Sequence, residues 1–165
     1  MCIKYAQYIR GLDWKALGNG AVVVDLGGGY GYVGTAVARA HSNMQIVVQD
    51  LESNSEPVRK AMPHDLKDRI RFQTQDFFQP QPGDFIMSPP RADLISSGLF
   101  NWSDQDCIKI LRKLIEAMEQ GKGNSGMKLS IADRVSPDKP CEMPLHREAL
   151  ARAFDVFMHT LFATG

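Results

Sequence analysis

Length, composition and charge narrow the possible functions before any motif is considered. The chain has 165 residues, which is room for one domain with a substantial core. Its 19 basic and 19 acidic residues balance, so the sequence carries no electrostatic signature of binding to nucleic acid or to a membrane surface. No apolar run approaches the roughly 20 residues that span a bilayer. We therefore expect a small-molecule partner, with no nucleic acid and no membrane.

Cysteine and histidine spacing argues against a disulfide framework and against a metal site. The three cysteines lie far apart in sequence and form no CxxC or other metal-binding pattern, and the N-terminus has no signal-peptide pattern. The four histidines are equally scattered. We expect reduced thiols, a cytoplasmic location and no metal. The residues concerned are Cys2, Cys107, Cys141, His41, His64, His146 and His159.

Apolar runs and amphipathic stretches alternate along the chain, which predicts an α/β fold with a mainly parallel sheet. Buried strands are expected at residues 21–26, 45–50, 70–75 and 127–133. Helices are expected at residues 32–40, 55–62, 104–120 and 144–162. Proline-containing loop covers residues 79–91, and one more strand is expected at either 84–87 or 92–96.

Two of these helices carry a predicted apolar face. Ser103 is the expected N-cap of helix 104–120. The expected core-facing residues of that helix are Ile108, Leu111, Leu114, Ile115 and Met118. Those of helix 32–40 are Val33, Ala36, Val37 and Ala40.

A glycine-rich segment joins the first strand to the first helix. Glycine at positions 27–29 and 31 lets a ligand approach the backbone, and the helix N-terminus presents free N–H groups to a polar ligand. Asp50 ends the next strand about 20 residues on, where a carboxylate can bind both hydroxyls of a ribose. Asp76 follows the third strand, near the expected position of an adenine amino group.

Two cofactors fit this loop. Gly29, Gly31 and Gly34 form a GxGxxG pattern, which keeps NAD as an alternative, and a tight turn without a ligand is the third reading. Asp25, just before the glycines, favours S-adenosyl-L-methionine. A carboxylate there suits the positive amino group of the methionine tail and would repel a pyrophosphate.

Several segments, in order, resemble motifs of the caffeic-acid-type small-molecule O-methyltransferases, in particular their fungal branch in secondary metabolism. The segments are Val23–Gly29, Val48–Leu51, Gln75–Phe78, Asn101–Leu111, Ile131–Val135 and Arg152–Val156. The resemblance implies a Rossmann-like class I methyltransferase domain at residues 21–165, lacking its last strands, after a short helical lead-in at residues 1–20. It also implies transfer of a methyl group from S-adenosyl-L-methionine to a phenol or enol.

The same resemblance assigns roles to individual residues. Asp50 would bind the ribose, Leu51 would pack on the adenine, and Asp76 and Phe77 would flank its other edge. The methionine tail would lie along Gly27, Gly29 and Gly31. Weaker substrate candidates are Asn101, Met158 and His159, the last two on the final helix.

The chain departs from the family pattern where the general base is expected. The family has a histidine before the Asn/Asp-Trp pair, and here that position is Phe100, which cannot accept a proton. General-base assistance is worth about 10²–10⁴ in rate. Asp133 matches the acid that positions this base, and it becomes the catalytic candidate. The family's preceding helical domain and its later strands also have no counterpart in this sequence.

These departures leave alternatives to methylation. One is a relative that uses the sulfonium as a fixed charge for dehydration or a pericyclic rearrangement. A second is a non-catalytic scaffold subunit, because uncovered apolar surface would favour a homo- or hetero-oligomer. A third is methylation of nitrogen, suggested by Ser88-Pro89-Pro90, although the aromatic residue of that motif is replaced by Arg91.

Overall fold

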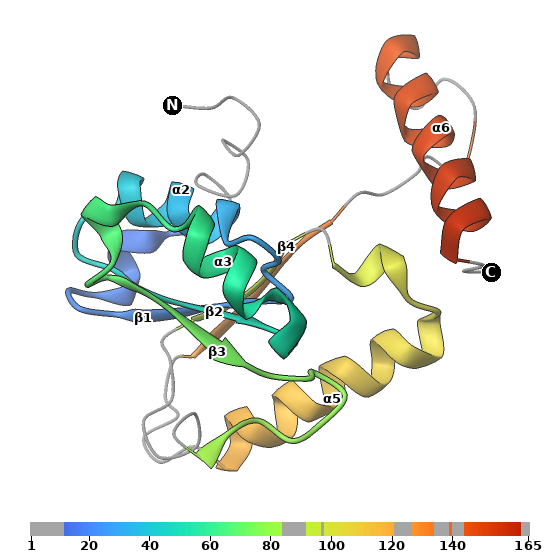
Figure 1. The fold of residues 1–165 in the computed structure, drawn as a ribbon. Coiled ribbons are helices and arrows are strands. Elements are labelled where there is room, and N and C mark those ends of the chain that lie inside the picture. Colours follow the sequence, from blue (N-terminus) through green and yellow to red (C-terminus); the bar gives the residue numbers. More distant parts are fainter. Residues whose placement is uncertain are drawn as a thin grey trace.

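Five parallel strands form one sheet in the order β3-β2-β1-β4-β5 (Figure 1). The structure is a computed structural model and describes residues 12–83, 92–96, 98–120, 127–133, 139 and 144–162. The strands are β1 Val22–Leu26, β2 Gln45–Asp50, β3 Ile70–Thr74, β4 Ala92–Ser96 and β5 Lys128–Ala132. The predicted parallel α/β fold is confirmed.

Helices follow most of these strands. The α-helices are α2 Tyr32–Ala40, α3 Ser55–Ala61, α5 Asp104–Gln120 and α6 Leu145–Phe162. Short 3-10 turns are η2 Trp14–Leu17, η3 Glu52–Asn54, η4 His64–Leu66 and η5 Leu99–Asn101. The bounds of α2 and α5 are the expected ones. Of the two places left open for the fourth strand, the structure has 92–96, while residues 84–87 lie outside the described ranges.

Hydrophobic residues pack on both faces of the sheet. In Figure 1, α2 and α3 cover one face and α5 the other, while α6 stands apart from the sheet. Val23, Ile46 and Val48 belong to the core on the α2–α3 side. Val24, Leu26 and Val47 belong to the core on the α5 side. Alternate residues of β1 and β2 thus face opposite helices, as expected for strands buried on both sides.

The face of α5 that packs on the sheet overlaps the predicted one: Leu114 is fully buried and Leu111 packs against the same core. Ile110, Leu114 and Ala117 are buried, whereas Ile108 is 48% and Ile115 is 47% exposed. The helix carries two overlapping apolar stripes, and contact with Val24, Leu26 and Val47 buries Leu114 and Ala117. The prediction for Ile108 and Ile115 was therefore wrong.

The structure corrects one predicted core position of α2 and confirms the predicted N-cap of α5. On α2, Ala40 is exposed, and the buried positions are Gly34, Val37 and Ala38. The Ser103 cap of α5 is confirmed, because its Oγ accepts a hydrogen bond of 3.3 Å from the Asp106 N–H. Among the described residues, no helix is long and apolar enough to cross a membrane.

Candidate functional site

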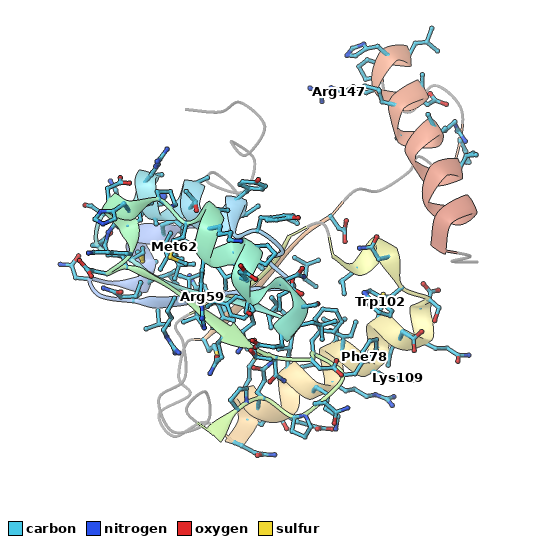
Figure 2. The ribbon with its side chains drawn as sticks, viewed as in Figure 1. Arg59, Met62, Phe78, Trp102, Lys109 and Arg147 are labelled. Carbon is cyan, nitrogen blue, oxygen red and sulfur yellow. The ribbon has the colours of Figure 1, made fainter. Side chains whose placement is uncertain are left out.

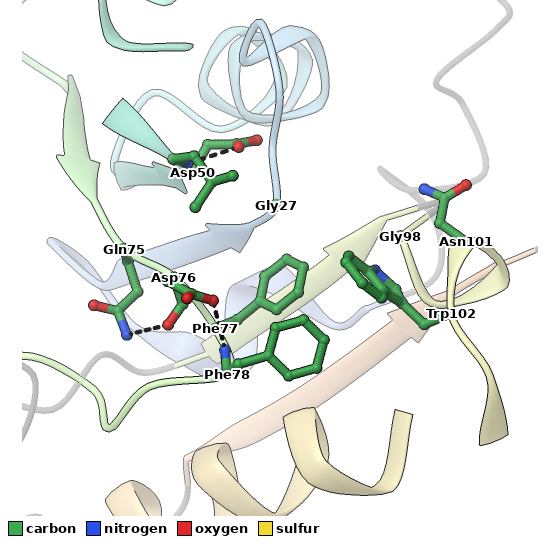
Figure 3. Close-up of a pocket in the computed structure, with 10 residues that line it drawn as sticks. Gly27, Asp50, Gln75, Asp76, Phe77, Phe78, Gly98, Asn101 and Trp102 are labelled. Atoms are coloured by element: carbon green, nitrogen blue, oxygen red, sulfur yellow. Dashed lines mark hydrogen bonds between the residues drawn. The ribbon is translucent and has the colours of Figure 1, made fainter. Parts of the chain in front are cut away.

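A cavity of about 360 Å³ opens where the strands end. Small-molecule sites commonly measure ~300–1,000 Å³. The walls come from segments after β1, β2, β3 and β4, and ligands of open parallel sheets bind at this carboxyl edge, where the strand order reverses. The lining residues are Gly27, Asp50, Leu51, Gln75, Asp76, Phe77, Phe78, Gly98, Asn101 and Trp102 (Figure 3).

Asp50 forms the acidic wall of this cavity. Its Oδ2 accepts a hydrogen bond of 2.7 Å from the Gly29 N–H. Its Oδ1 accepts bonds of 2.8 Å from the Leu51 N–H and 2.9 Å from Asn54 Nδ2. A carboxylate offers about four lone-pair positions, so Oδ2 can accept one more donor, such as a ligand hydroxyl. Three protein donors therefore fix the orientation of this carboxylate.

Gly27 lines the cavity at the start of the glycine loop. Its φ is 63°, in the left-handed region that favours glycine. A Cβ added there would lie 3.1 Å from Cε1 of Phe77. The loop therefore passes close to an aromatic ring, and a larger residue would both strain the backbone and push against the cavity wall.

Asp25 does not lie in the cavity, which differs from the sequence argument. The residue is 0% exposed, and its Oδ2 accepts a hydrogen bond of 3.1 Å from the Gly34 N–H near the start of α2. A Cβ added at Gly28 would come within 2.9 Å of Asp25 Cγ. The glycines here make room for the carboxylate under the loop. Its structural effect is to hold β1, the loop and α2 together.

Gly29 and Gly31 line the loop and not the cavity itself. The Gly29 N–H is used by Asp50, and Gly31 is the residue before α2, with a φ of 70°. Their expected contact with a methionine tail stays a prediction. Both residues shape the turn that brings Gly27 to the cavity edge.

Aromatic rings form the wall opposite Asp50. Phe77 and Phe78 both meet Trp102 edge-on, with ring centroids 5.8 Å and 4.8 Å apart (Figure 3). The side chains of Phe78 and Trp102 also lie beside each other near the first turns of α5 in Figure 2. Edge-to-face pairs at these separations are stabilising, and the rings offer flat apolar surface to a planar ligand. Leu51, 52% exposed, adds an aliphatic side chain to the rim.

The segment that carries Asp76 and Phe77 is anchored by the side chain of Gln75. Gln75 Nε2 lies within hydrogen-bond distance of three carbonyl oxygens of the following turn, those of Asp76, Gln79 and Pro80. Asp76 Oδ1 in turn accepts a bond of 3.0 Å from the Phe78 N–H. The loop after β3 is therefore held in one conformation by its own side chains.

The last part of the wall is the turn η5, which contains the position where the family resemblance leads one to expect a histidine base. Phe100 lies in η5, and its side chain lies outside the described residues. Asn101, a predicted substrate residue, lines the cavity. Asp133 follows β5, and its Oδ2 accepts a hydrogen bond of 2.9 Å from the Leu99 N–H. The carboxylate of Asp133 is thus engaged with the backbone of the turn.

Other predicted positions cannot be placed at the site. Met158 and His159 lie on α6, and their side chains lie outside the described residues. Ser88–Arg91, Cys2 and Cys141 lie outside them as well. Within the described ranges, no group of three histidine, cysteine or acidic side chains is arranged to hold a metal ion.

Sequence reasoning missed some lining residues. Gln75, Phe78, Gly98 and Trp102 were given no role, and Trp102 lies 37% exposed at the cavity. Phe78 could have been found from its place beside Phe77. The position of Trp102 depends on how the turn after β4 meets the loop after β3, which no local pattern reveals.

The sheet order and the site at its carboxyl edge are those of class I methyltransferases, and comparison with known proteins identifies the family. The O-methyltransferase domain family matches residues 4–160, and this chain belongs to it. O-methyltransferase pgmB of Aspergillus terreus (strain NIH 2624 / FGSC A1156) is 37% identical over 91% of the chain. The chain spans 41% of the length of that relative.

Solved structures agree with this placement. The O-methyltransferase NcsB1, crystallised with S-adenosyl-L-homocysteine and 1,4-dihydroxy-2-naphthoic acid, has a TM-score of 0.71 and 25% identity. The match covers 97% of this chain and 42% of NcsB1. TnmH has a TM-score of 0.76 at 24% identity, over 97% of this chain and 43% of TnmH, and supports the fold alone.

Proposed function

We propose that residues 21–165, after a lead-in at 1–20, form the cofactor-binding domain of a cytoplasmic O-methyltransferase that acts on a phenolic or enolic secondary metabolite. The observation that carries the proposal is the cavity itself. It places a fixed carboxylate, Asp50, opposite the aromatic wall of Phe77, Phe78 and Trp102, at the carboxyl edge of the sheet. Such a cavity suits a nucleoside, whose sugar carries hydroxyl donors and whose base is planar.

In this proposal the cavity holds S-adenosyl-L-methionine. Asp50 Oδ2 accepts a hydrogen bond from a ribose hydroxyl, and Leu51 and Phe77 flank the adenine. Asp76 accepts a hydrogen bond from the adenine amino group. The methionine tail follows Gly27 toward Gly29 and Gly31. The bound cofactor supplies a methyl group on a positively charged sulfur. The crystallisation of NcsB1 with the demethylated cofactor supports this choice over NAD.

Methyl transfer then depends on how the chain orients the acceptor, since phenylalanine at position 100 cannot take a proton. Alignment of two reacting groups can supply a large part of a barrier, of order 7–11 kcal/mol in well-oriented systems. We therefore propose an acceptor whose hydroxyl is acidic enough to ionise without help from residue 100. Asn101 lies at the cavity wall, where its amide can bind such an oxygen.

Assembly with a further protein surface is part of the proposal. Three apolar side chains of α6 are widely exposed: Leu145 is 81%, Leu150 is 68% and Val156 is 66% accessible. Apolar surface of this kind favours burial against a partner. We propose a homo- or hetero-oligomer, and sedimentation of the purified chain tests it. A compact monomer at all concentrations would contradict it.

The first test of the cofactor site is calorimetric titration with S-adenosyl-L-methionine and with S-adenosyl-L-homocysteine. We expect both to bind, and Asp50→Ala to weaken both by more than about tenfold, because a charged hydrogen-bond acceptor is lost. Glu56→Ala is the matched control, an exposed acid paired only with exposed Lys60 in this part of the structure. Absence of binding to a folded wild-type sample would contradict the proposal.

The second test asks whether the methyl group is transferred. Labelled donor is incubated with a panel of phenols, and both product and consumed donor are measured. Product and consumed donor in equal amounts support methylation. Turnover that requires the donor without consuming it would instead indicate the fixed-charge chemistry that Phe100 suggests.

A further inference from the structure

Both backbone polar groups of Leu99 are held by side chains, those of Asp133 and Cys107, that the proposed function leaves without a role. Its N–H donates to Asp133 Oδ2 at 2.9 Å. The Leu99 carbonyl oxygen accepts from the Trp102 N–H at 3.0 Å and from Cys107 Sγ at 3.3 Å. These contacts join the end of β5, the turn η5 and the first turn of α5 at one residue.

The chemistry of Cys107 fits the role of a donor. Burial raises the pKa of the Cys107 thiol, and the nearby carboxylates of Asp104, Asp133 and Asp106 raise it further. The thiol therefore keeps its proton, which it can donate to the Leu99 carbonyl oxygen. It is a poor nucleophile for the same reason.

The turn held in this way carries part of the cavity wall. Gly98 precedes η5, Asn101 ends it and Trp102 follows, and all three line the cavity. Trp102 in turn meets Phe77 and Phe78, which lie on the loop after β3. A movement of the Leu99 peptide would therefore move both Asn101 and the aromatic wall.

We propose that Asp133 is a positioning residue and not the proton acceptor. Its carboxylate holds the Leu99 N–H and so places Asn101 and Trp102 against the bound ligand. This role rests on the proposed function for the identity of the ligand, S-adenosyl-L-methionine. Holding the Leu99 N–H needs only an acceptor oxygen, which asparagine also has. A general base needs the ionised carboxylate, which asparagine lacks.

The experiment compares Asp133→Asn, Asp133→Ala and the control Asp68→Ala, an exposed acid remote from the cavity. Affinity for S-adenosyl-L-methionine is measured by calorimetry, and the environment of Trp102 by its fluorescence emission. The other tryptophan, Trp14, is 3% exposed within the core. Repeating each measurement in a Trp102→Phe background assigns any change of emission to Trp102.

We expect Asp133→Ala to weaken binding about tenfold, the size typical of a lost charge-assisted hydrogen bond, and to shift the Trp102 emission to longer wavelength. Asp133→Asn should stay within about twofold of the wild type in both measurements, because the acceptor oxygen is kept. An unchanged Asp133→Ala variant would overturn the proposal. So would an Asp133→Asn variant as impaired as Asp133→Ala, since the charge would then be required.

The two proposals fail in distinguishable ways. If the folded wild type binds no S-adenosyl-L-methionine, the proposed function fails, while the emission of Trp102 in the three variants still decides whether Asp133 holds the turn. If methyl transfer is detected, loss of transfer in Asp133→Asn with unchanged cofactor affinity would overturn the positioning role and restore the base.

Discussion

The carboxylate of Asp50 at the end of β2 accepts a hydrogen bond of 2.7 Å from the Gly29 N–H in the loop after β1. This bond joins two of the segments that wall the cavity before any ligand is present. Because Leu51 and Asn54 donate to the other oxygen, the carboxylate is oriented in advance. A ligand hydroxyl then meets a carboxylate that needs little rearrangement, which reduces the entropic cost of binding.

Gly27→Ala should weaken binding of S-adenosyl-L-methionine severalfold. The new Cβ would lie 3.1 Å from Phe77 Cε1, and alanine at a φ of 63° carries a backbone cost of about 1–2 kcal/mol. Gly20→Ala is the matched control, because its φ is 71° and no atom lies within 4 Å of the added Cβ. Calorimetry and chemical denaturation measure both variants. Equal loss of affinity in the two would show that the cavity contact has no effect.

Asp25→Ala should lower the free energy of unfolding by about 1–3 kcal/mol, because it leaves the buried Gly34 N–H without this acceptor. Urea denaturation measures the change, with Asp65→Ala, an exposed acid, as control. A variant of normal stability that fails to bind S-adenosyl-L-methionine would contradict a purely structural role of Asp25. It would place the Asp25 carboxylate against the methionine amino group, as the sequence alone suggests.

Stability should fall at mildly acidic pH because of His41, whose ring stacks on buried Trp14. Burial lowers the pKa of His41 below its ordinary value of about 6.5. The unfolded state therefore binds the proton more readily, and unfolding becomes easier as the pH falls below about 6.5. Urea denaturation between about pH 5 and pH 8 measures this slope. His41→Gln should flatten it, and the same slope in His41→Gln as in the wild type would contradict the assignment. His64→Gln, at an exposed histidine, is the control.

Ser103→Ala should lower the free energy of unfolding by about 1 kcal/mol, within the usual 0.5–2 kcal/mol range for a lost N-cap. The Ser103 Oγ accepts from the Asp106 N–H at 3.3 Å and donates to Asp106 Oδ2 at 3.0 Å. Ser103→Thr keeps the hydroxyl and should retain most of the stability in thermal or chemical denaturation. Equal destabilisation by alanine and threonine would show that the cap hydrogen bond is not the cause.

Local sequence was sufficient for features that depend on neighbouring residues. The alternation of apolar runs and amphipathic stretches predicted the parallel sheet, and the bounds of α2 and α5 came from helical periodicity and a capping serine. The acids at the strand ends were also recognisable, because the carboxyl ends of parallel strands share one edge. Asp50, Asp76 and Phe77 accordingly meet at one cavity.

Tertiary structure decided the features that depend on distant parts of the chain. Sequence determined that α5 carries apolar stripes, but contact with β1 and β2 buries Ala117 beside Leu114 and leaves Ile108 exposed. Sequence determined that an acid lies close to the end of β1, but the packing of α2 turned Asp25 under the loop toward Gly34. The contact of Trp102 with Phe78 and of Asp133 with Leu99 joins residues 24 and 34 positions apart. Such contacts are set by the packing of whole elements against the sheet, and no local pattern encodes them.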